Sequence, residues 1–355
     1  MAKIRRMFPG GNTSQGFVSF HDNIIGPNRN MLYILKGMPG GGKSSLMKYI
    51  AERALKEGYS VEYHHCPSDP NSIDGIVIDE LSIGIVDGTF PHIIDPTYPG
   101  LIDKLIDLGQ FIDRQKLIGF KENIIEAKVN NKIAYRKAFA YFKSAKIIYE
   151  EIAQNNKSGV DFIKINYKTK ELIDEIFSRG TANREELILV ERHMFSNANT
   201  PEGYVDYTQT ILEEIPTIYY IEGEIGTGKS TLIKRLIEKS KMKGYSMEIY
   251  HNATIPEKIE TLIIKDIDIC ITSNKNALKF PHNKVNLNEY FNQNIKDIKD
   301  YEVYYLLIEK GIFHLSKAKN NHEILEKSYR PAVNYEGVTK VREELLKEIL
   351  SSGKS

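Results

Sequence analysis

The chain has 355 residues, of which 41% are hydrophobic and 27% charged, and this length and composition predict about two ordinary globular domains. Its 48 Lys and Arg residues are balanced by 47 Asp and Glu residues, so we expect neither a nucleic-acid-binding protein nor a membrane protein. The two cysteines argue against a disulfide scaffold and a four-cysteine zinc site. No apolar run is long enough to span a bilayer and no signal peptide is evident, so we expect a cytoplasmic protein.

The first half of the chain predicts a strand, a glycine-rich loop and a helix in succession. A β-forming run at 31–35 precedes residues 37–44, which have the form GxxxxGKS, and a helical pattern follows at 44–56. In this setting the motif is typical of a phosphate-binding loop, or P-loop. Glycines let backbone N–H groups converge on phosphate, and the helix adds its positive N-terminal end. We expect Lys43 to reach the β- and γ-phosphates and Ser44 to offer its hydroxyl to Mg²⁺.

A carboxylate at the end of a neighbouring strand is expected to complete the metal site. The apolar run 83–86 ends in Asp87, which we interpret as this carboxylate. Asp79 and Glu80 end the preceding run at 76–78 and are the alternatives, and one of them would instead orient the attacking water. The predicted catalytic residues are therefore Lys43, Asp87 and Glu80, with Ser44 and Asp87 as metal ligands.

A helix-rich tail follows, and the whole pattern then returns in the second half. The tail predicts an apolar helix face formed by Tyr135, Ala138, Phe142, Ala145, Tyr149 and Ile152. A second GxxxxGKS stretch lies at 223–230, and the shift of 229 − 43 = 186 recurs in 244 − 58 = 186 for Gly-Tyr-Ser. We predict two tandem α/β modules, 1–182 and 183–355, joined near 178–183. Each is expected to have a parallel sheet flanked by helices and a helical appendage.

The second copy differs from the first at the predicted metal site. An ungapped alignment places Ser273 opposite Asp87 and Asp266 opposite Glu80, whereas Lys229 and Ser230 are retained. We therefore expect Ser230 to offer a metal ligand, and the second loop to bind nucleotide more than it hydrolyses it. The residues predicted to bind the nucleotide are the glycines, lysines and hydroxyl residues of the two loops: Gly37, Gly40, Gly41, Gly42, Lys43, Ser44, Ser45, Gly223, Gly226, Gly228, Lys229, Ser230 and Thr231.

Two groups of histidines allow other interpretations. His64, His65 and Cys66, followed by Asp69, are residue types that bind metals. They end a strand-like run, however, and the repeat keeps only His251 among them, so we do not predict a metal site there. His92 and His282 each follow Phe-Pro, and both a nucleotide contact and a structural hydrogen bond remain open for them.

The chain resembles a family of uncharacterised tandem P-loop ATPases found in Gram-positive bacteria of the Bacillus and Clostridium type. The resemblance covers nearly the whole chain, and the residues that carry it are Met7-Phe8, Asn12-Thr13, Gly16-Phe17, the two glycine-rich loops, Tyr63-His64, Cys66, Ser68-Asp69-Pro70, Ser72-Ile73-Asp74-Gly75, Asp87-Gly88-Thr89-Phe90-Pro91-His92 and Pro99-Gly100. It implies ATP binding and hydrolysis. The second copy lacks the Asp-Gly-Thr element, which puts its hydrolysis in doubt.

The leading functional expectation is an ATPase that uses ATP, Mg²⁺ and water. A small-molecule kinase is the first alternative, with Arg114, Lys116, Arg136 and Lys137 as candidates to clamp phosphates. A nucleotide-gated scaffold with little turnover is the second. Residues 274–277 lack the Asp of a guanine-binding motif, so adenine is the better expectation. The two halves are expected to pack on each other around a pseudo-twofold axis, and the sequence identifies no protein partner.

Overall fold

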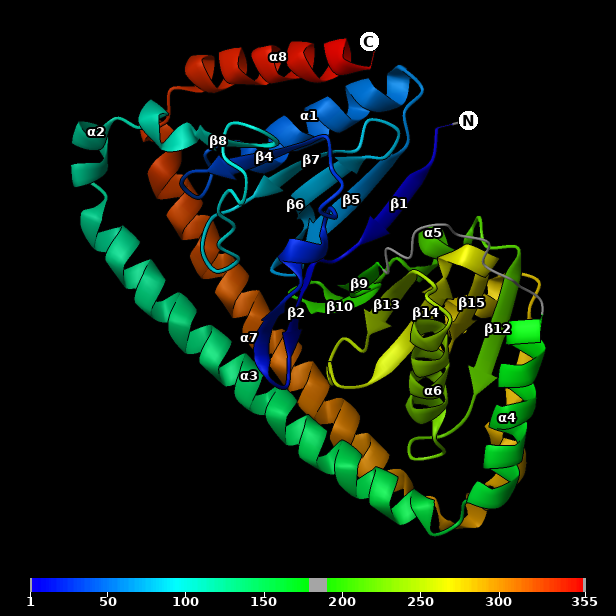
Figure 1. Cartoon of the computed structure of the whole chain (residues 1–355). Coiled ribbons are helices and arrows are strands. Elements are labelled where there is room, and N and C mark those ends of the chain that lie inside the picture. Colours follow the sequence, from blue (N-terminus) through cyan, green and yellow to red (C-terminus); the bar gives the residue numbers. More distant parts are fainter. Residues whose placement is uncertain (1, 179–189, 354–355) are drawn as a thin grey trace.

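The computed structural model describes residues 2–178 and 190–353, which contain two six-stranded sheets (Figure 1). The first half forms, in order, β1 (Ile4–Met7), β2 (Gly10–Thr13), β3 (Gly16–Ser19), η1 (His21–Asn23), β4 (Met31–Lys36), α1 (Lys43–Lys56), β5 (Val61–Cys66), β6 (Asp69–Ile78), β7 (Ile83–Asp87), β8 (Asp103–Asp107), η2 (Leu108–Phe111), α2 (Arg114–Ile118), α3 (Lys121–Lys157) and α4 (Phe162–Ser178). The second half forms β9 (Glu191–Met194), β10 (Asn197–Thr200), β11 (Gly203–Asp206), α5 (Thr208–Leu212), β12 (Thr217–Glu222), α6 (Lys229–Met242), β13 (Met247–His251), β14 (Ile259–Ile264), η3 (Lys265–Ile267), β15 (Ile269–Thr272), η4 (Lys275–Lys279), β16 (Asn283–Asn286), η5 (Leu287–Tyr290), η6 (Gln293–Ile295), α7 (Ile298–Tyr329), η7 (Arg330–Ala332) and α8 (Tyr335–Ser352). The expected α/β class with two modules is confirmed.

Both sheets are mixed, so the prediction of parallel sheets was wrong. The strand order is β1-β5-β6-β7-β4-β8 in the first sheet and β9-β13-β14-β15-β12-β16 in the second. β6 and β14 run antiparallel to both of their neighbours, whereas the other neighbouring strands are parallel. The reason is that β5, β6 and β7 follow one another through short connections, whereas a parallel crossover needs about a dozen residues or more.

The two faces of the first sheet belong to different hydrophobic cores, as the strand β4 shows. Its side chains alternate between the two faces of the sheet. Tyr33 and Leu35 pack in a core with α1 and α8, whereas Leu32 and Ile34 belong to a core to which both halves contribute. The two modules therefore share apolar contacts instead of packing separately.

Helices from each half complete the module of the other half (Figure 1). α3 and α7 lie side by side and connect the two modules. α4, which follows α3, packs Leu172 and Ile176 into the core of the second sheet, whereas α8, which follows α7, packs Leu345 and Ile349 into the core of the first. Packing therefore crosses the predicted division at residue 182. The predicted joint itself, after Ser178, lies outside the described residues.

The apolar face predicted for the tail of the first half is the face that α3 packs against α7. Ala138 and Phe142 are fully buried there and form a cluster with Leu315. A Cβ atom at Gly311 of α7 would lie 2.3 Å from a ring carbon of Phe142, so glycine permits the close approach of the two helices. None of the helices in the described residues is both long and apolar enough to cross a membrane.

The contact between the halves has approximate twofold symmetry, as expected from the repeat. Phe8 and Phe195 exchange backbone hydrogen bonds, with N···O distances of 2.8 and 3.0 Å. The Asn12 amide donates to the carbonyl of Asn199 at 3.2 Å, and the Asn199 amide donates to that of Asn12 at 3.5 Å. Both pairs are separated by 187 positions (195 − 8 and 199 − 12), so each joins equivalent residues of the two copies.

The helix exchange can be tested with a matched pair of variants, Leu345→Ala and Leu172→Ala. Each side chain is buried in the core of the opposite half, so each truncation should lower the free energy of unfolding by about 2–5 kcal/mol. Leu345→Ala should raise amide hydrogen exchange in α1 and β4, and Leu172→Ala in α6 and β12. If Leu345→Ala instead loosened β12, α8 would belong to its own half.

Candidate functional site

The first glycine-rich loop (residues 37–44) joins β4 to α1 and is wound too tightly for larger residues. Gly40 and Gly42 have φ angles of +69° and +88°, which favour glycine. A Cβ atom at Gly41 would lie 2.5 Å from the sulfur of Met38. The left-handed Gly42 immediately precedes α1, which begins at Lys43, so the first N–H groups of the helix lie next to the loop. This arrangement gives the loop a concentration of backbone donors and positive potential.

The structure brings Lys43, Ser44 and Asp87 together at this loop. The Lys43 ammonium donates to the carbonyl oxygens of Gly37 and Met38 at 3.0 Å each, and its Nζ lies 3.5 Å from Asp87 Oδ2. The Ser44 hydroxyl accepts a hydrogen bond from the backbone N–H of Ile73 at 3.1 Å. β7 pairs in parallel with β4, and this pairing positions Asp87 at the loop.

Glu80 does not join this group, and its predicted catalytic role is corrected. β6 and β7 form an antiparallel pair, so the connection that holds Asp79 and Glu80 lies at the opposite end of β7 from Asp87. The Glu80 carboxylate accepts hydrogen bonds from the backbone and hydroxyl of Ser60 at 2.7 Å each. Asp79 lies at the same distant end, where burial and the charge of Glu62 raise its pKa to about 7.

The second half supplies the cover of the first loop. A Cβ atom at Gly40 would lie 3.1 Å from Arg330 Cγ, and the Tyr335 hydroxyl donates to the Gly40 carbonyl at 2.8 Å. Val338 of α8 packs near Gly42. Arg330, which the sequence analysis did not identify, therefore lies beside this loop, and its guanidinium pairs with Glu326 at 2.6 Å. The clamp candidates Arg114, Lys116, Arg136 and Lys137 are exposed on α2 and α3.

The second glycine-rich loop (residues 223–230) has the same backbone form. Gly226 and Gly228 have φ angles of +87° and +96°, and α6 begins at Lys229. The Lys229 ammonium donates to the carbonyls of Gly223 and Glu224, and the Ser230 hydroxyl accepts from the N–H of Ile259 at 2.9 Å. Ser45 and Thr231, the hydroxyl residues that follow each motif, are exposed on the first turns of their helices.

The side chains around the second loop differ from those around the first. The Ser273 hydroxyl, which replaces the Asp87 carboxylate, donates to the carbonyl of Glu260 at 3.4 Å. Glu224, within the loop, pairs with Lys296 at 2.9 Å and accepts from the Tyr301 hydroxyl at 3.0 Å. Burial lowers the pKa of Lys229 to about 8, although the neighbouring Glu224 opposes this shift. The loop thus carries a negative charge where the first has Met38.

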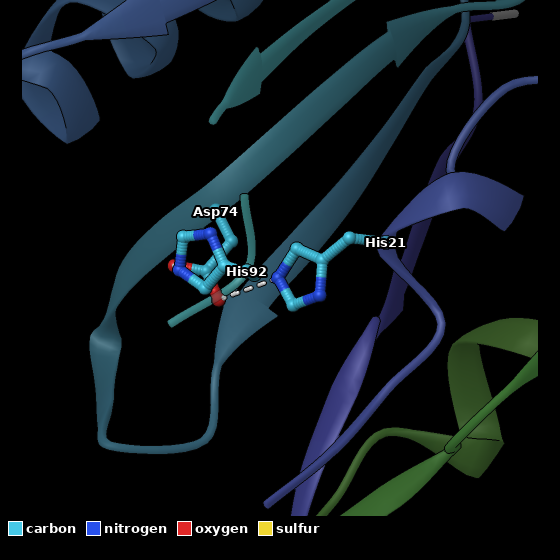
Figure 2. A group of neighbouring side chains, drawn as sticks. All are labelled: His21, Asp74 and His92. Carbon is cyan, nitrogen blue, oxygen red and sulfur yellow. Dashed lines mark hydrogen bonds and ion pairs between the residues drawn. The ribbon is translucent and has the colours of Figure 1, made fainter. Parts of the chain in front are cut away.

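Two buried histidines and one buried aspartate form a group that contacts the backbone of Asp87 through His92. We call it the histidine–aspartate cluster (His21, Asp74 and His92; Figure 2). His21 belongs to η1, Asp74 to β6, and His92 to the segment after β7. His21 Nε2 lies 3.3 Å from Asp74 Oδ2, and His92 Nε2 lies 3.8 Å from Asp74 Oδ1. The two imidazole rings stack with centroids 4.2 Å apart.

The surroundings of the cluster set its protonation. Burial alone would raise the pKa of Asp74, but the adjacent His92 and a hydrogen bond with His21 hold it below the ordinary value. Burial lowers the pKa of His21 even though Asp74 opposes the shift. The Cys66 thiol is hydrogen-bonded to Asp74, and burial raises its pKa, so the thiol stays protonated and donates to the carboxylate.

The other histidines considered from the sequence have hydrogen-bond or ion-pair partners outside this cluster. His65 Nδ1 contacts the carbonyl of Pro70 at 2.8 Å, and His64 Nε2 lies 3.4 Å from Glu62. His282 contacts the carbonyl of Phe280 through Nδ1 and packs edge-on against Tyr220. His92, by contrast, belongs to a site that the sequence analysis missed, because its other members lie 71 and 18 positions away (92 − 21 and 92 − 74).

The first loop can therefore hold a polyanion and a divalent cation. Lys43 and the N–H groups at the start of α1 could donate to a polyanion, and the Ser44 hydroxyl and the Asp87 carboxylate could bind a cation. Comparison of the chain with models of protein families, with curated proteins and with solved structures gives no match. The geometry of the loops and of the cluster is thus the basis for inferring function.

Proposed function

We propose that the protein is a P-loop ATPase whose first loop binds Mg-ATP and supports hydrolysis, whereas its second loop binds nucleotide with little turnover. The observation that carries this proposal is the 3.5 Å approach of Lys43 Nζ to Asp87 Oδ2 at the start of α1. A lysine for phosphate and a carboxylate for the magnesium site are the two charges that phosphoryl transfer requires beside such a loop.

The residues of the first loop have distinct roles in this proposal. Lys43 leaves the carbonyls of Gly37 and Met38 and donates instead to phosphate oxygens. Ser44 and Asp87 would hold the magnesium ion, and the backbone N–H of Thr89 orients Asp87 by donating to Oδ1 at 2.9 Å. When bound, Mg-ATP supplies the phosphoryl group and the divalent charge that stabilises it.

The charges around the second loop support binding without efficient turnover. Lys229 and Ser230 have the same backbone partners as their counterparts in the first loop. Ser273, however, offers no carboxylate to a metal ion, and Glu224 places a negative charge close to where phosphate would lie. Like charges in a partly buried site repel, so nucleotide binding there requires Lys296 to stay paired with Glu224.

A nucleotide-responsive scaffold is a second candidate, and the exchanged helices favour it. The end of α7 and the start of α8 contact the first loop, and the end of α3 contacts the second, where the Asn156 amide donates to the carbonyl of Ile225 at 2.9 Å. A nucleotide at either loop would therefore act on helices of the opposite half. No comparable observation favours a small-molecule kinase.

Phosphate release from the full chain with Mg-ATP and no added acceptor tests the proposal. We expect steady release of inorganic phosphate that stops when EDTA removes Mg²⁺, because Ser44 and Asp87 would then hold no cation. Nucleotide binding should be measured in parallel from the rise in melting temperature. Binding without release would favour the scaffold, release only in the presence of an added acceptor would favour a kinase, and absence of both binding and release would contradict all three.

A further inference from the structure

The histidine–aspartate cluster has the composition and spacing of a transition-metal site. One ligand atom from each of His21, Asp74 and His92 can be chosen so that all three lie within 4.8 Å of one another, and all three residues are buried. Ligand atoms bound at about 2.0–2.2 Å in a tetrahedral arrangement lie roughly 3.3–3.6 Å apart. The distance of 3.3 Å from His21 Nε2 to Asp74 Oδ2 falls in this range, whereas His92 Nε2 lies 3.8 Å from the other carboxylate oxygen, Oδ1, so binding of one ion requires the stacked rings to shift.

The hydrogen bonds of His92 direct its lone pair towards Asp74. Its Nδ1 lies 2.9 Å from the carbonyl oxygen of Asp87, and a carbonyl oxygen only accepts, so Nδ1 carries the proton. In a neutral imidazole, Nε2 then presents a lone pair to Asp74 Oδ1, which is also an acceptor. The distance of 3.8 Å is too long for a hydrogen bond. A buried acceptor that faces another acceptor is unfavourable unless a cation lies between them.

Without an ion, His21 Nε2 donates to Asp74 Oδ2 at 3.3 Å (Figure 2), and its Nδ1 accepts from the hydroxyl of Ser19 at 2.8 Å. The Ser19 hydroxyl can also accept a proton from Nδ1, so binding of an ion would reverse this hydrogen bond and leave the Nε2 lone pair for the metal. Metal-binding histidines commonly donate their second N–H to an oxygen in this manner, which fixes the tautomer and the orientation of the ring. His92 therefore already makes this outer hydrogen bond, and His21 has an oxygen at Ser19 that can accept it.

We propose that His21 Nε2, Asp74 and His92 Nε2 bind one divalent transition-metal ion of the Zn²⁺ type. Two imidazoles with one carboxylate suit such ions, whereas Mg²⁺ prefers oxygen ligands and reluctantly loses water. This site is distinct from the magnesium site at Ser44 and Asp87, and it does not depend on the proposed ATPase function.

The position of the site gives the metal a role beside the first loop. His92 donates from Nδ1 to the backbone of Asp87, whose carboxylate lies 3.5 Å from Lys43. A metal ion that fixes the His92 ring also fixes this end of β7. The ion would thus hold in place the residue on which the proposed magnesium site depends.

The second copy provides an internal control, because it lacks the counterpart of His21 and its counterpart of His92 has other contacts. The positions equivalent to His21 and Asp74 are Thr208 (21 + 187) and Glu260 (74 + 186), and Asn197 donates a hydrogen bond to the Glu260 carboxylate. His282 follows the same Phe-Pro dipeptide as His92 but contacts Tyr220 instead. The proposal therefore requires a single site per chain, in the first half.

Metal binding by the full chain without nucleotide tests the proposal. After dialysis against Zn²⁺ in the presence of excess Mg²⁺, we expect about one equivalent of zinc per chain, because Mg²⁺ competes poorly for imidazole. His21→Ala and His92→Ala should lose this equivalent. His282→Ala and His322→Ala should retain it, because the former is the counterpart in the second half and the latter is an exposed histidine beside Glu326. With Co²⁺ as the probe, wild type should show visible absorption that the His92→Ala variant lacks.

Two results would overturn the proposal. One is wild-type protein that retains no stoichiometric Zn²⁺ or Co²⁺ after dialysis, and this result does not depend on any variant folding correctly. The other is retention of the metal by His21→Ala and His92→Ala when circular dichroism shows that both are folded. Because both measurements omit ATP, their failure would leave the proposed ATPase activity untouched, and loss of phosphate release would not imply loss of metal.

Discussion

Lys43→Ala should remove most of the phosphate release, whereas Lys229→Ala should leave most of it. Lys43 lies beside Asp87, and in the proposed function these residues are the cation for phosphate and the carboxylate for magnesium. Removing one charged donor from such a site reduces turnover by about 10²–10³-fold. At the second loop, Lys229 lies beside Glu224, and Ser273 takes the alignment position of Asp87, so loss of Lys229 should weaken nucleotide binding with little effect on the rate. Steady-state phosphate release with saturating Mg-ATP measures the difference.

The two lysine variants are matched controls for each other, because each removes the same group from an equivalent loop. Nucleotide binding to both should be followed by calorimetry, and their folding by circular dichroism. An equal loss of rate in the two variants would contradict the functional difference between the loops. A rate unchanged in both would show that neither loop is the site of hydrolysis.

The glycine-rich loops could be predicted from the sequence because their geometry is local. Gly42 and Gly228 must take left-handed angles so that a helix can begin at the following lysine, and this requirement concerns adjacent residues only. Asp87 was also predictable, because it ends an apolar strand that must lie near the loop. Glu80 was misassigned because the same rule was applied to β6, whose direction is reversed by the short connection to β7.

Features that depend on distant contacts could not be predicted in this way. Apolar periodicity indicated that the tail helices pack, but it does not say against which half they pack, and α4 and α8 are exchanged. His21 has no sequence signal of its own, and its partnership with Asp74 and His92 arises from sheet pairing. A comparison of the two copies could nevertheless have pointed to these positions, because the second copy has Thr208 in place of His21 and Glu260 in place of Asp74.

The net charge, which is close to zero, also did not predict a buried network of four charged side chains between the halves. Arg5 contacts Glu62 at 2.5 Å and also contacts Glu248, while Arg192 contacts Glu62 at 2.5 Å and Glu248 at 3.3 Å. Arg5 and Arg192 are equivalent residues of the two copies (192 − 5 = 187), as are Glu62 and Glu248 (248 − 62 = 186). Each arginine therefore bridges both modules, and the network lies at the twofold contact.

The two carboxylates of this network should make the stability of the protein sensitive to acid. Burial by itself would raise the pKa of Glu62 and Glu248. Arg192 and Arg5 nevertheless hold that of Glu62 below the ordinary value of 4.5, and Arg5, Lys265 and Arg192 do the same for Glu248. The unfolded chain therefore takes up protons at a higher pH than the folded chain does. The stabilisation is complete above about pH 4.5 and is lost as the pH falls towards the lower pKa values of the folded state. Urea unfolding at a series of pH values should show this loss.

Glu248→Gln should lower the free energy of unfolding by about 3–5 kcal/mol at pH 7, because it leaves two buried arginines with one carboxylate. The same variant should lose less stability than wild type between pH 7 and pH 4, since one of the titrating groups is gone. Glu214→Gln is a suitable control, because the ion pair of Glu214 with Lys3 is exposed and is expected to contribute about 1 kcal/mol or less. If Glu248→Gln cost no more than Glu214→Gln, the apolar core shared by the two halves, and not the charge network, would hold the modules together.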